Sequence, residues 1–150
     1  MNQEAYSYNN ILPRKYSFVS EGEKRIVKLV EFTRTGDENI VNLGFGDLLP
    51  DTDFDDQVVS NNGDIMKIFA TIIQIVKEFT AEFPHLKITF AGSTPERMKL
   101  YNRILKTYYS DFSKEFQISG LVEDALTELE ADFEPKVPGK YILYFVKRKS

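Results

Sequence analysis

One short segment, residues 92–97, has the residue types and spacing that best fit a site for binding or chemistry. A glycine turn, Gly92-Ser93-Thr94, follows an alternating apolar segment and precedes a helical one. Free backbone amides at the start of a helix bind anions, and the Arg97 guanidinium could add a charge-assisted contact. Gly92, Ser93, Thr94 and Arg97 are therefore candidates for a small-anion or nucleotide site.

Arg97 also has a purely structural interpretation. A cation in the first turn of a helix opposes the helix dipole, which favours acidic residues at that end. An internal carboxylate would compensate, and Asp47 and Asp64 are the acids that we expect to supply it. The capping signal before Arg97, a threonine followed by a proline, also fits a structural role. The sequence leaves both interpretations of Arg97 open.

Other kinds of chemistry find little support in the sequence. It contains no cysteine and one histidine, which argues against thiol catalysis, cysteine-ligated zinc and a two-histidine metal site. Asp51, Asp53 and Asp55 match the first three ligand positions of a calcium-binding EF-hand loop. The sixth and twelfth positions of that loop are Asp56 and Asn62, where the motif needs glycine and glutamate. We therefore predict no metal site and no cofactor.

The composition predicts one globular domain over residues 1–150. The chain is 42% hydrophobic and 13% aromatic, which is ordinary for a folded protein of this length. A net charge of −4 argues against general nucleic-acid binding. No segment is long and apolar enough to cross a membrane, and cysteines are absent. We expect a cytoplasmic monomer or weak dimer, whose partner is a protein or a small anionic ligand.

The N-terminal half predicts strands followed by a helix. Residues 1–13 show no periodicity, and we expect an irregular lead-in there. Alternating apolar residues predict three antiparallel strands: 15–20, 24–34 and 39–45. Apolar residues recur at three- and four-residue spacing from Ile65 to Phe83, which predicts an amphipathic helix that ends at Pro84.

The C-terminal half predicts a second helix, from the glycine turn to about Tyr109. Lys99, Arg103 and Lys106 lie opposite its apolar side, and we expect a solvated face there. Residues 120–139 are rich in acids and predict a short helix or an acidic excursion. Three further strands are predicted: 86–91, 112–119 and 140–147.

These elements predict an α+β fold in the order β-β-β-α-β-α-β-β. We expect one twisted, largely antiparallel sheet of five to six strands, with the two main helices packed on it.

The order of elements resembles the central and C-terminal part of the GCN5-related N-acetyltransferases. The segment from Thr94 to Tyr101 is similar in spacing to a C-terminal motif of that family. The resemblance implies that Tyr101 is the acid that protonates the departing thiolate of coenzyme A. The family has a glycine-rich pyrophosphate loop at the position of residues 60–64, and the only glycine in this segment is Gly63. The resemblance therefore implies a degenerate or atypical acyltransferase.

A second resemblance covers the middle of the chain. It is carried by Gly46-Asp47, by Asn61-Asn62-Gly63-Asp64, and by Gly92-Ser93-Thr94 with Arg97 and Leu100-Tyr101. These groups are similar to those of a family of single-domain bacterial proteins from Bacteroidetes that has no established activity. This resemblance implies a fold and no particular reaction.

The sequence thus leaves the function open between three interpretations. The first is a non-enzymatic binding or interaction domain, with its site near the turn from Gly92 to Arg97. The alternatives are an atypical acyltransferase that uses Tyr101, and a small-anion or nucleotide site at the start of the second helix.

Overall fold

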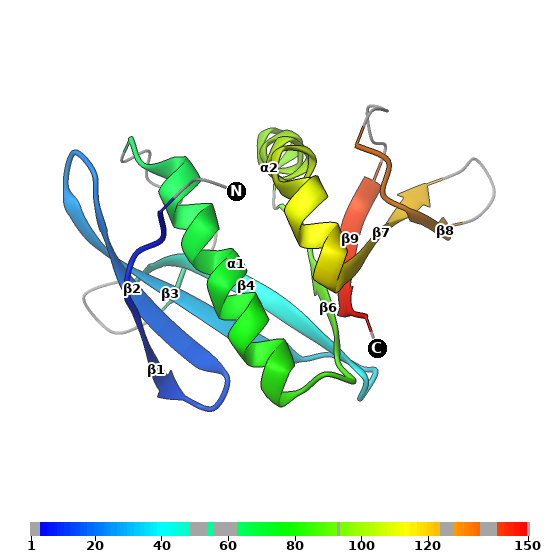
Figure 1. The fold of residues 1–150 in the computed structure, drawn as a ribbon, viewed down its shortest axis with the longest axis horizontal. Coiled ribbons are helices and arrows are strands. Elements are labelled where there is room, and N and C mark those ends of the chain that lie inside the picture. Colours follow the sequence, from blue (N-terminus) through cyan, green and yellow to red (C-terminus); the bar gives the residue numbers. More distant parts are fainter. Residues whose placement is uncertain are drawn as a thin grey trace. The chain divides into compact units, whose positions relative to one another are not determined.

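The structure is a computed structural model. It describes the following residues: 4–48, 54–55, 63–92, 94–123, 128–135 and 141–149. The chain divides into two compact units. The N-terminal unit comprises residues 2–34 and 42–83, and the C-terminal unit comprises residues 35–41 and 84–150. Each unit has its own helix and its own strands (Figure 1), and each is described separately.

The N-terminal unit contains five strands, and β4 begins in the last residues of the 35–41 segment. Their bounds are β1 Tyr8–Leu12, β2 Lys15–Glu21, β3 Arg25–Arg34, β4 Ile40–Leu48 and β5 Phe54–Asp55. The strand order is β1-β2-β3-β4, and β5 pairs with β4. The β1–β2, β2–β3 and β4–β5 pairs are antiparallel. The three strands predicted for this part of the chain are confirmed as β2, β3 and β4.

Strand β1 shows that the expected irregular lead-in is wrong for residues 8–12. The backbone of these residues pairs with β2, and the Tyr8 ring packs edge-on against Tyr16 at 6.1 Å between centroids. The rest of the strand is exposed. An exposed strand needs no alternation of apolar and polar residues, so the sequence pattern gave no signal for it.

Helix α1 runs over Ile65–Glu82 and confirms the predicted amphipathic helix. Phe79 stacks on Phe32 of β3 with 3.9 Å between ring centroids, and Phe69 contacts Phe45 of β4 edge-on at 5.8 Å. Figure 1 shows α1 lying across β2, β3 and β4. Its buried face also contains the residues Ile68, Ala70, Thr71, Ile72, Ile75, Val76 and Thr80. Burial of this face against the strands is the main hydrophobic contribution in this unit.

The C-terminal unit contains four strands and a helix. Their bounds are β6 Lys87–Phe90, α2 Pro95–Glu115, β7 Phe116–Glu123, β8 Glu128–Asp132 and β9 Tyr141–Arg148. The strand order is β6-β9-β7-β8, and these three pairs are antiparallel. Tyr101 of α2 contacts Phe90 of β6, and Phe112 of α2 stacks on Phe116. The predicted α+β fold, with largely antiparallel strands and two main helices packed on them, is confirmed. The expected number of five to six strands is too low, because β1, β5 and β8 were not predicted.

Helix α2 is longer than predicted. It continues from Tyr109 to Glu115 and includes Phe112, which the sequence analysis assigned to a strand. Phe112 follows the buried Tyr108 by four residues, so it stays on the buried face of the helix. The strand therefore begins at Phe116 instead of Phe112.

Strands also occupy the described part of the acidic region 120–139, for which the sequence predicts a short helix or an acidic excursion. Residues 120–123 complete β7, and Glu128–Asp132 form β8. A short helix is wrong for this described part of residues 120–139. Glu128, Glu130 and Asp132 alternate with Leu129 and Ala131, which is the period of a strand.

None of the helices among the described residues is long and apolar enough to cross a bilayer. The prediction of a single domain over residues 1–150 stays a prediction.

Candidate functional site

Gly92 allows the chain to turn tightly onto the start of α2. A Cβ atom at this position would lie 2.6 Å from Cβ of Arg97 and 2.8 Å from the Met98 amide nitrogen. Real Cβ atoms do not approach other atoms this closely, so only glycine fits without a shift of the backbone. The Gly92 amide donates a hydrogen bond to Sδ of Met98 at 3.0 Å. The glycine in the predicted turn therefore has a packing role.

Thr94 is the N-cap of α2. Its Oγ1 accepts a hydrogen bond from the Arg97 amide at 3.2 Å, and its carbonyl accepts one from the Met98 amide at 3.1 Å. Pro95 is the first residue of the helix, where its missing N–H costs nothing. The threonine cap followed by proline is confirmed, while Ser93 lies outside the described residues.

These contacts reduce the support for an anion at the turn. The Gly92 amide is bound to Met98, and the Arg97 amide is bound to Thr94. Such an anion would have to displace both hydrogen bonds or use the remaining amides. Arg97 is half-buried and already has an interaction. A small-anion site at Gly92, Ser93, Thr94 and Arg97 stays a prediction.

Asp47 lies in β4 and forms an ion pair with Lys28 of β3. The Lys28 side chain is fully buried and that of Asp47 nearly so. An ammonium group in such a position needs a carboxylate, because an unpaired buried charge costs several kcal/mol. Lys28 was not among the predicted site residues, although it is in phase with the inward-facing Val30 and Phe32. A lysine on the apolar face of a predicted strand was the sequence signal for a buried ion pair.

Asp64 links the start of α1 to β2 and to the segment that precedes β1. Its Oδ2 accepts hydrogen bonds from the Tyr6 hydroxyl and the Ser20 hydroxyl, both at 2.5 Å. Burial, followed by the hydrogen bond to Asp64, raises the pKa of Tyr6. As the N-cap of α1, Asp64 makes no side-chain capping bond, and within the described part of the chain its buried Oδ1 has no hydrogen-bond partner. Asp47 and Asp64 thus have other partners, and their pairing with Arg97 stays a prediction.

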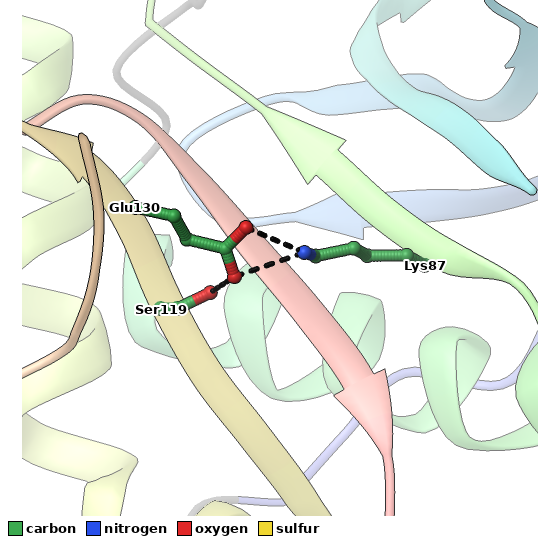
Figure 2. Close-up of polar contacts among 3 residues, drawn as sticks. All are labelled: Lys87, Ser119 and Glu130. Atoms are coloured by element: carbon green, nitrogen blue, oxygen red, sulfur yellow. Dashed lines mark hydrogen bonds and ion pairs between the residues drawn. The ribbon is translucent and has the colours of Figure 1, made fainter. Parts of the chain in front are cut away.

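The C-terminal unit has a second polar cluster, formed by Lys87, Ser119 and Glu130 (Figure 2). The Lys87 Nζ donates to both Glu130 carboxylate oxygens, at 2.7 and 2.9 Å, and the Ser119 hydroxyl donates to Oε2 at 2.8 Å. The Lys87 ammonium also lies 4.3 Å from the centroid of the Phe145 ring. The cluster thereby links β6, β7, β8 and β9.

The chemistry of this cluster fits a structural link better than catalysis. The hydrogen bond from Lys87 is the main cause that lowers the pKa of Glu130, so this carboxylate is a weak base. Ser119 is 4% exposed, which leaves its hydroxyl little access to a substrate. This cluster was not predicted from the sequence, because β8 was not predicted, and the alternating acids of β8 were the available signal.

Tyr101, the candidate acid of the acyltransferase interpretation, is half-buried in α2. Its ring meets Phe90 edge-on, with 5.7 Å between centroids and 73° between planes. Phe90 also stacks on Tyr144 of β9. Tyr101 therefore contributes to the aromatic packing of the C-terminal unit, and its role as an acid stays a prediction.

One face of α2 carries a row of cations: Lys99, Arg103 and Lys106. We call these three residues the cationic row, and all three are exposed. Within the described part of the chain, their side chains make no ion pair and no hydrogen bond. The same helix does hold a pair farther along, since Lys114 lies 3.9 Å from Asp111.

Among the described residues, no group of three or more His, Cys, Asp or Glu side chains could hold a metal ion. Asp51, Asp53 and Asp56 of the EF-hand-like segment lie outside the described residues. The absence of a metal site stays a prediction.

The class of protein is a small α+β domain in which many polar groups are paired or serve as helix caps. The described residues contain no complete set of catalytic groups. The chain belongs to a family of unknown function, DUF6934, whose model matches residues 2–149. No curated protein and no solved structure matches the chain. The resemblance to a family without an established activity is thus confirmed at the level of the family.

Proposed function

We propose that the chain is a non-catalytic binding domain that holds an acidic segment of another protein on the cationic row of α2. The observation that carries the proposal is that Lys99, Arg103 and Lys106 are exposed and have no ionic partner in the described part of the chain. The row begins two residues after Arg97. It therefore adjoins the turn at which the sequence analysis placed a binding surface.

The spacing of the cationic row defines what it could bind. Residues at i, i+4 and i+7 share one face of a helix. With a rise of 1.5 Å per residue, Lys99 and Lys106 are about 10 Å apart along the helix axis. Three carboxylates spread over about 10 Å would match this row, as on one face of a partner helix or along an extended strand.

The cationic row has an energetic cost in the absence of a partner. Like charges at i, i+3 and i, i+4 destabilise a helix by about 0.2–0.5 kcal/mol per pair. Lys99 with Arg103, and Arg103 with Lys106, form two such pairs. One acidic residue at position 103 would turn both repulsions into attractions. The unpaired row is consistent with a function that outweighs this cost.

The overall charge favours an acidic protein segment over a nucleic acid. The chain has a net charge of −4, so a long phosphate backbone would be repelled beyond the row itself. A short acidic segment needs to contact the row alone.

Fluorescence anisotropy with a labelled oligoglutamate peptide at low salt tests this proposal. The triple variant Lys99→Gln, Arg103→Gln, Lys106→Gln should bind about tenfold more weakly than wild type, because each exposed ion pair contributes about 0.2–1 kcal/mol. A matched control replaces three exposed cations elsewhere, with Lys24→Gln, Arg34→Gln and Lys147→Gln. This control should bind within about twofold of wild type.

Equal weakening in the two triple variants would contradict the proposal, because only the net charge would then matter. A labelled single-stranded oligonucleotide that binds more tightly than the peptide would also contradict it. Failure of wild type to bind the peptide at low salt would remove the cationic row as an acidic-segment site.

A second candidate function is an atypical acyltransferase that uses Tyr101 as the acid. The order of helices and strands on which that resemblance rests favours it. If acetyl-CoA binds, a concentration one hundred times its dissociation constant should stabilise the protein by about 2.7 kcal/mol, which a thermal melt would detect. An unchanged melting temperature at about 1 mM acetyl-CoA would refute this candidate.

We further propose that the protein is cytoplasmic. The absence of cysteine supports a reducing compartment.

A further inference from the structure

We propose that β1 is a self-association edge, at which the β1 strand of a second copy of the chain adds in antiparallel orientation. Strand β1 is the first in the strand order of the N-terminal unit, so its outer side has no neighbouring strand among the described residues. Ile11 is 50% exposed and Leu12 is 57% exposed. They are two of the three large hydrophobic residues that are exposed in the described part of the chain.

The absence of charged side chains on β1 favours a second copy of the chain as the strand that pairs with it. Residues 5–13 contain no charged side chain. Strand edges in soluble proteins are commonly protected from pairing by charged residues, above all by lysine. Two β1 strands in antiparallel pairing would place only uncharged residues opposite one another, with no repulsion between like charges.

Strand β8 provides a comparison within the same chain. It is the last strand in the order of the C-terminal unit. Three of its five residues are acids, Glu128, Glu130 and Asp132. Two copies of β8 in a pair would bring carboxylates together, which is destabilising. Of these two terminal strands, β1 alone lacks this protection.

The local geometry of β1 indicates a weak dimer. The register against β2 shifts between Asn10 and Leu12, which leaves Ile11 without a partner on β2. The regular part of the strand is therefore short, and a pair of five-residue strands buries little surface. Interfaces of this size belong to the small, transient class. We expect dissociation at micromolar to millimolar concentrations.

Sedimentation velocity over a range of about 5 to 500 µM tests this inference. Wild type should sediment faster as its concentration rises. Ile11→Lys with Leu12→Lys should remain monomeric over the whole range, because lysines on an edge strand prevent its pairing with another strand. The matched control is Val27→Lys, which places a lysine at the third exposed hydrophobic residue, on β3 away from the edge. Val27→Lys should associate as wild type does.

A disulfide experiment reports directly on the geometry, since the natural chain contains no cysteine. Oxidation should convert Ile11→Cys to a covalent dimer at least about tenfold faster than Val27→Cys at the same concentration. Equal rates would overturn the inference. So would a wild type that stays monomeric at about 500 µM, or an Ile11→Lys, Leu12→Lys variant that associates normally. These readouts are independent of the acidic peptide, so each proposal can fail without the other.

Discussion

Replacement of Tyr16 by phenylalanine should stabilise the protein. The Tyr16 side chain is fully buried, and its hydroxyl has no hydrogen-bond partner among the residues that the structure describes. A buried polar group without a partner costs about 1–3 kcal/mol. Phenylalanine removes the hydroxyl and keeps the ring contacts with Tyr8 and Phe32. We expect Tyr16→Phe to raise the free energy of unfolding by about 1 kcal/mol at pH 8, with an increase of about 2–4 °C in melting temperature.

The advantage of Tyr16→Phe should grow at alkaline pH. Burial, followed by the charges of Glu78 and Glu82, raises the pKa of Tyr16 from 10.0 to about 12. Because the folded pKa is the higher one, the contribution of the neutral phenol is complete below pH 10 and is lost as the pH rises towards 12. At pH 11 wild type should lose about 1.4 kcal/mol from this group. Denaturant unfolding at pH 8 and pH 11 measures the difference.

Tyr144→Phe provides a matched control in the C-terminal unit. Burial raises the pKa of Tyr144 to about 12 as well, so the same alkaline change is expected. The Tyr144 hydroxyl, however, donates to Oδ1 of Asn102 at 3.4 Å, so its removal at pH 8 should be neutral or slightly destabilising. A Tyr16→Phe variant that is less stable than wild type at pH 8, or whose advantage does not change with pH, would refute the reasoning.

Three further predictions concern the turn, the sheet and the polar cluster of the C-terminal unit. Thr94→Ala should lower the free energy of unfolding by about 0.5–2 kcal/mol, whereas Thr94→Ser should retain the cap, which denaturant unfolding would measure. Gly120→Ala should destabilise by about 1–3 kcal/mol, because its Cβ would overlap the Tyr141 ring, with Cε1 at 2.9 Å; a near-neutral result would show that the ring moves freely. Glu130→Gln should remove stability at pH 7. The difference from wild type should shrink as the pH falls below 4.5, because the lowered pKa of Glu130 contributes only while the carboxylate is ionised; a difference independent of pH would contradict this.

The fold was predictable wherever one face of an element is buried. Strand β2 alternates, and α1 places its apolar residues at helical spacing, because in both cases burial selects the residue types on one side. Strand β1 was missed for the opposite reason, whereas β8 was missed although its acids alternate with Leu129 and Ala131. Both are terminal strands, and exposure on β1 left its sequence free of any periodic constraint. The extra turns of α2 were missed because Phe112 fits a strand as well as it fits a helix.

The candidate site was predictable only in its local parts. The cap at Thr94 and the turn at Gly92 depend on neighbours in the sequence, and both were predicted from them. The partners of Asp47 and Asp64 depend on contacts across 19 to 58 residues of chain, with Lys28 and Tyr6. Sequence spacing carries no information about such contacts. Likewise, only the structure could show that the cationic row lacks an ionic partner in the described part of the chain.

The variant Arg103→Glu tests the central claim most directly, because stability and binding should change in opposite directions. The introduced carboxylate would pair with Lys99 and Lys106 and would remove two repulsions, which should raise the free energy of unfolding by about 0.8–2 kcal/mol. The same variant should lose binding of the labelled oligoglutamate peptide by more than about tenfold. A variant that is more stable and no longer binds the peptide is the result that we predict. Peptide binding equal to that of wild type in a folded Arg103→Glu variant would contradict the assignment of function to this face of α2.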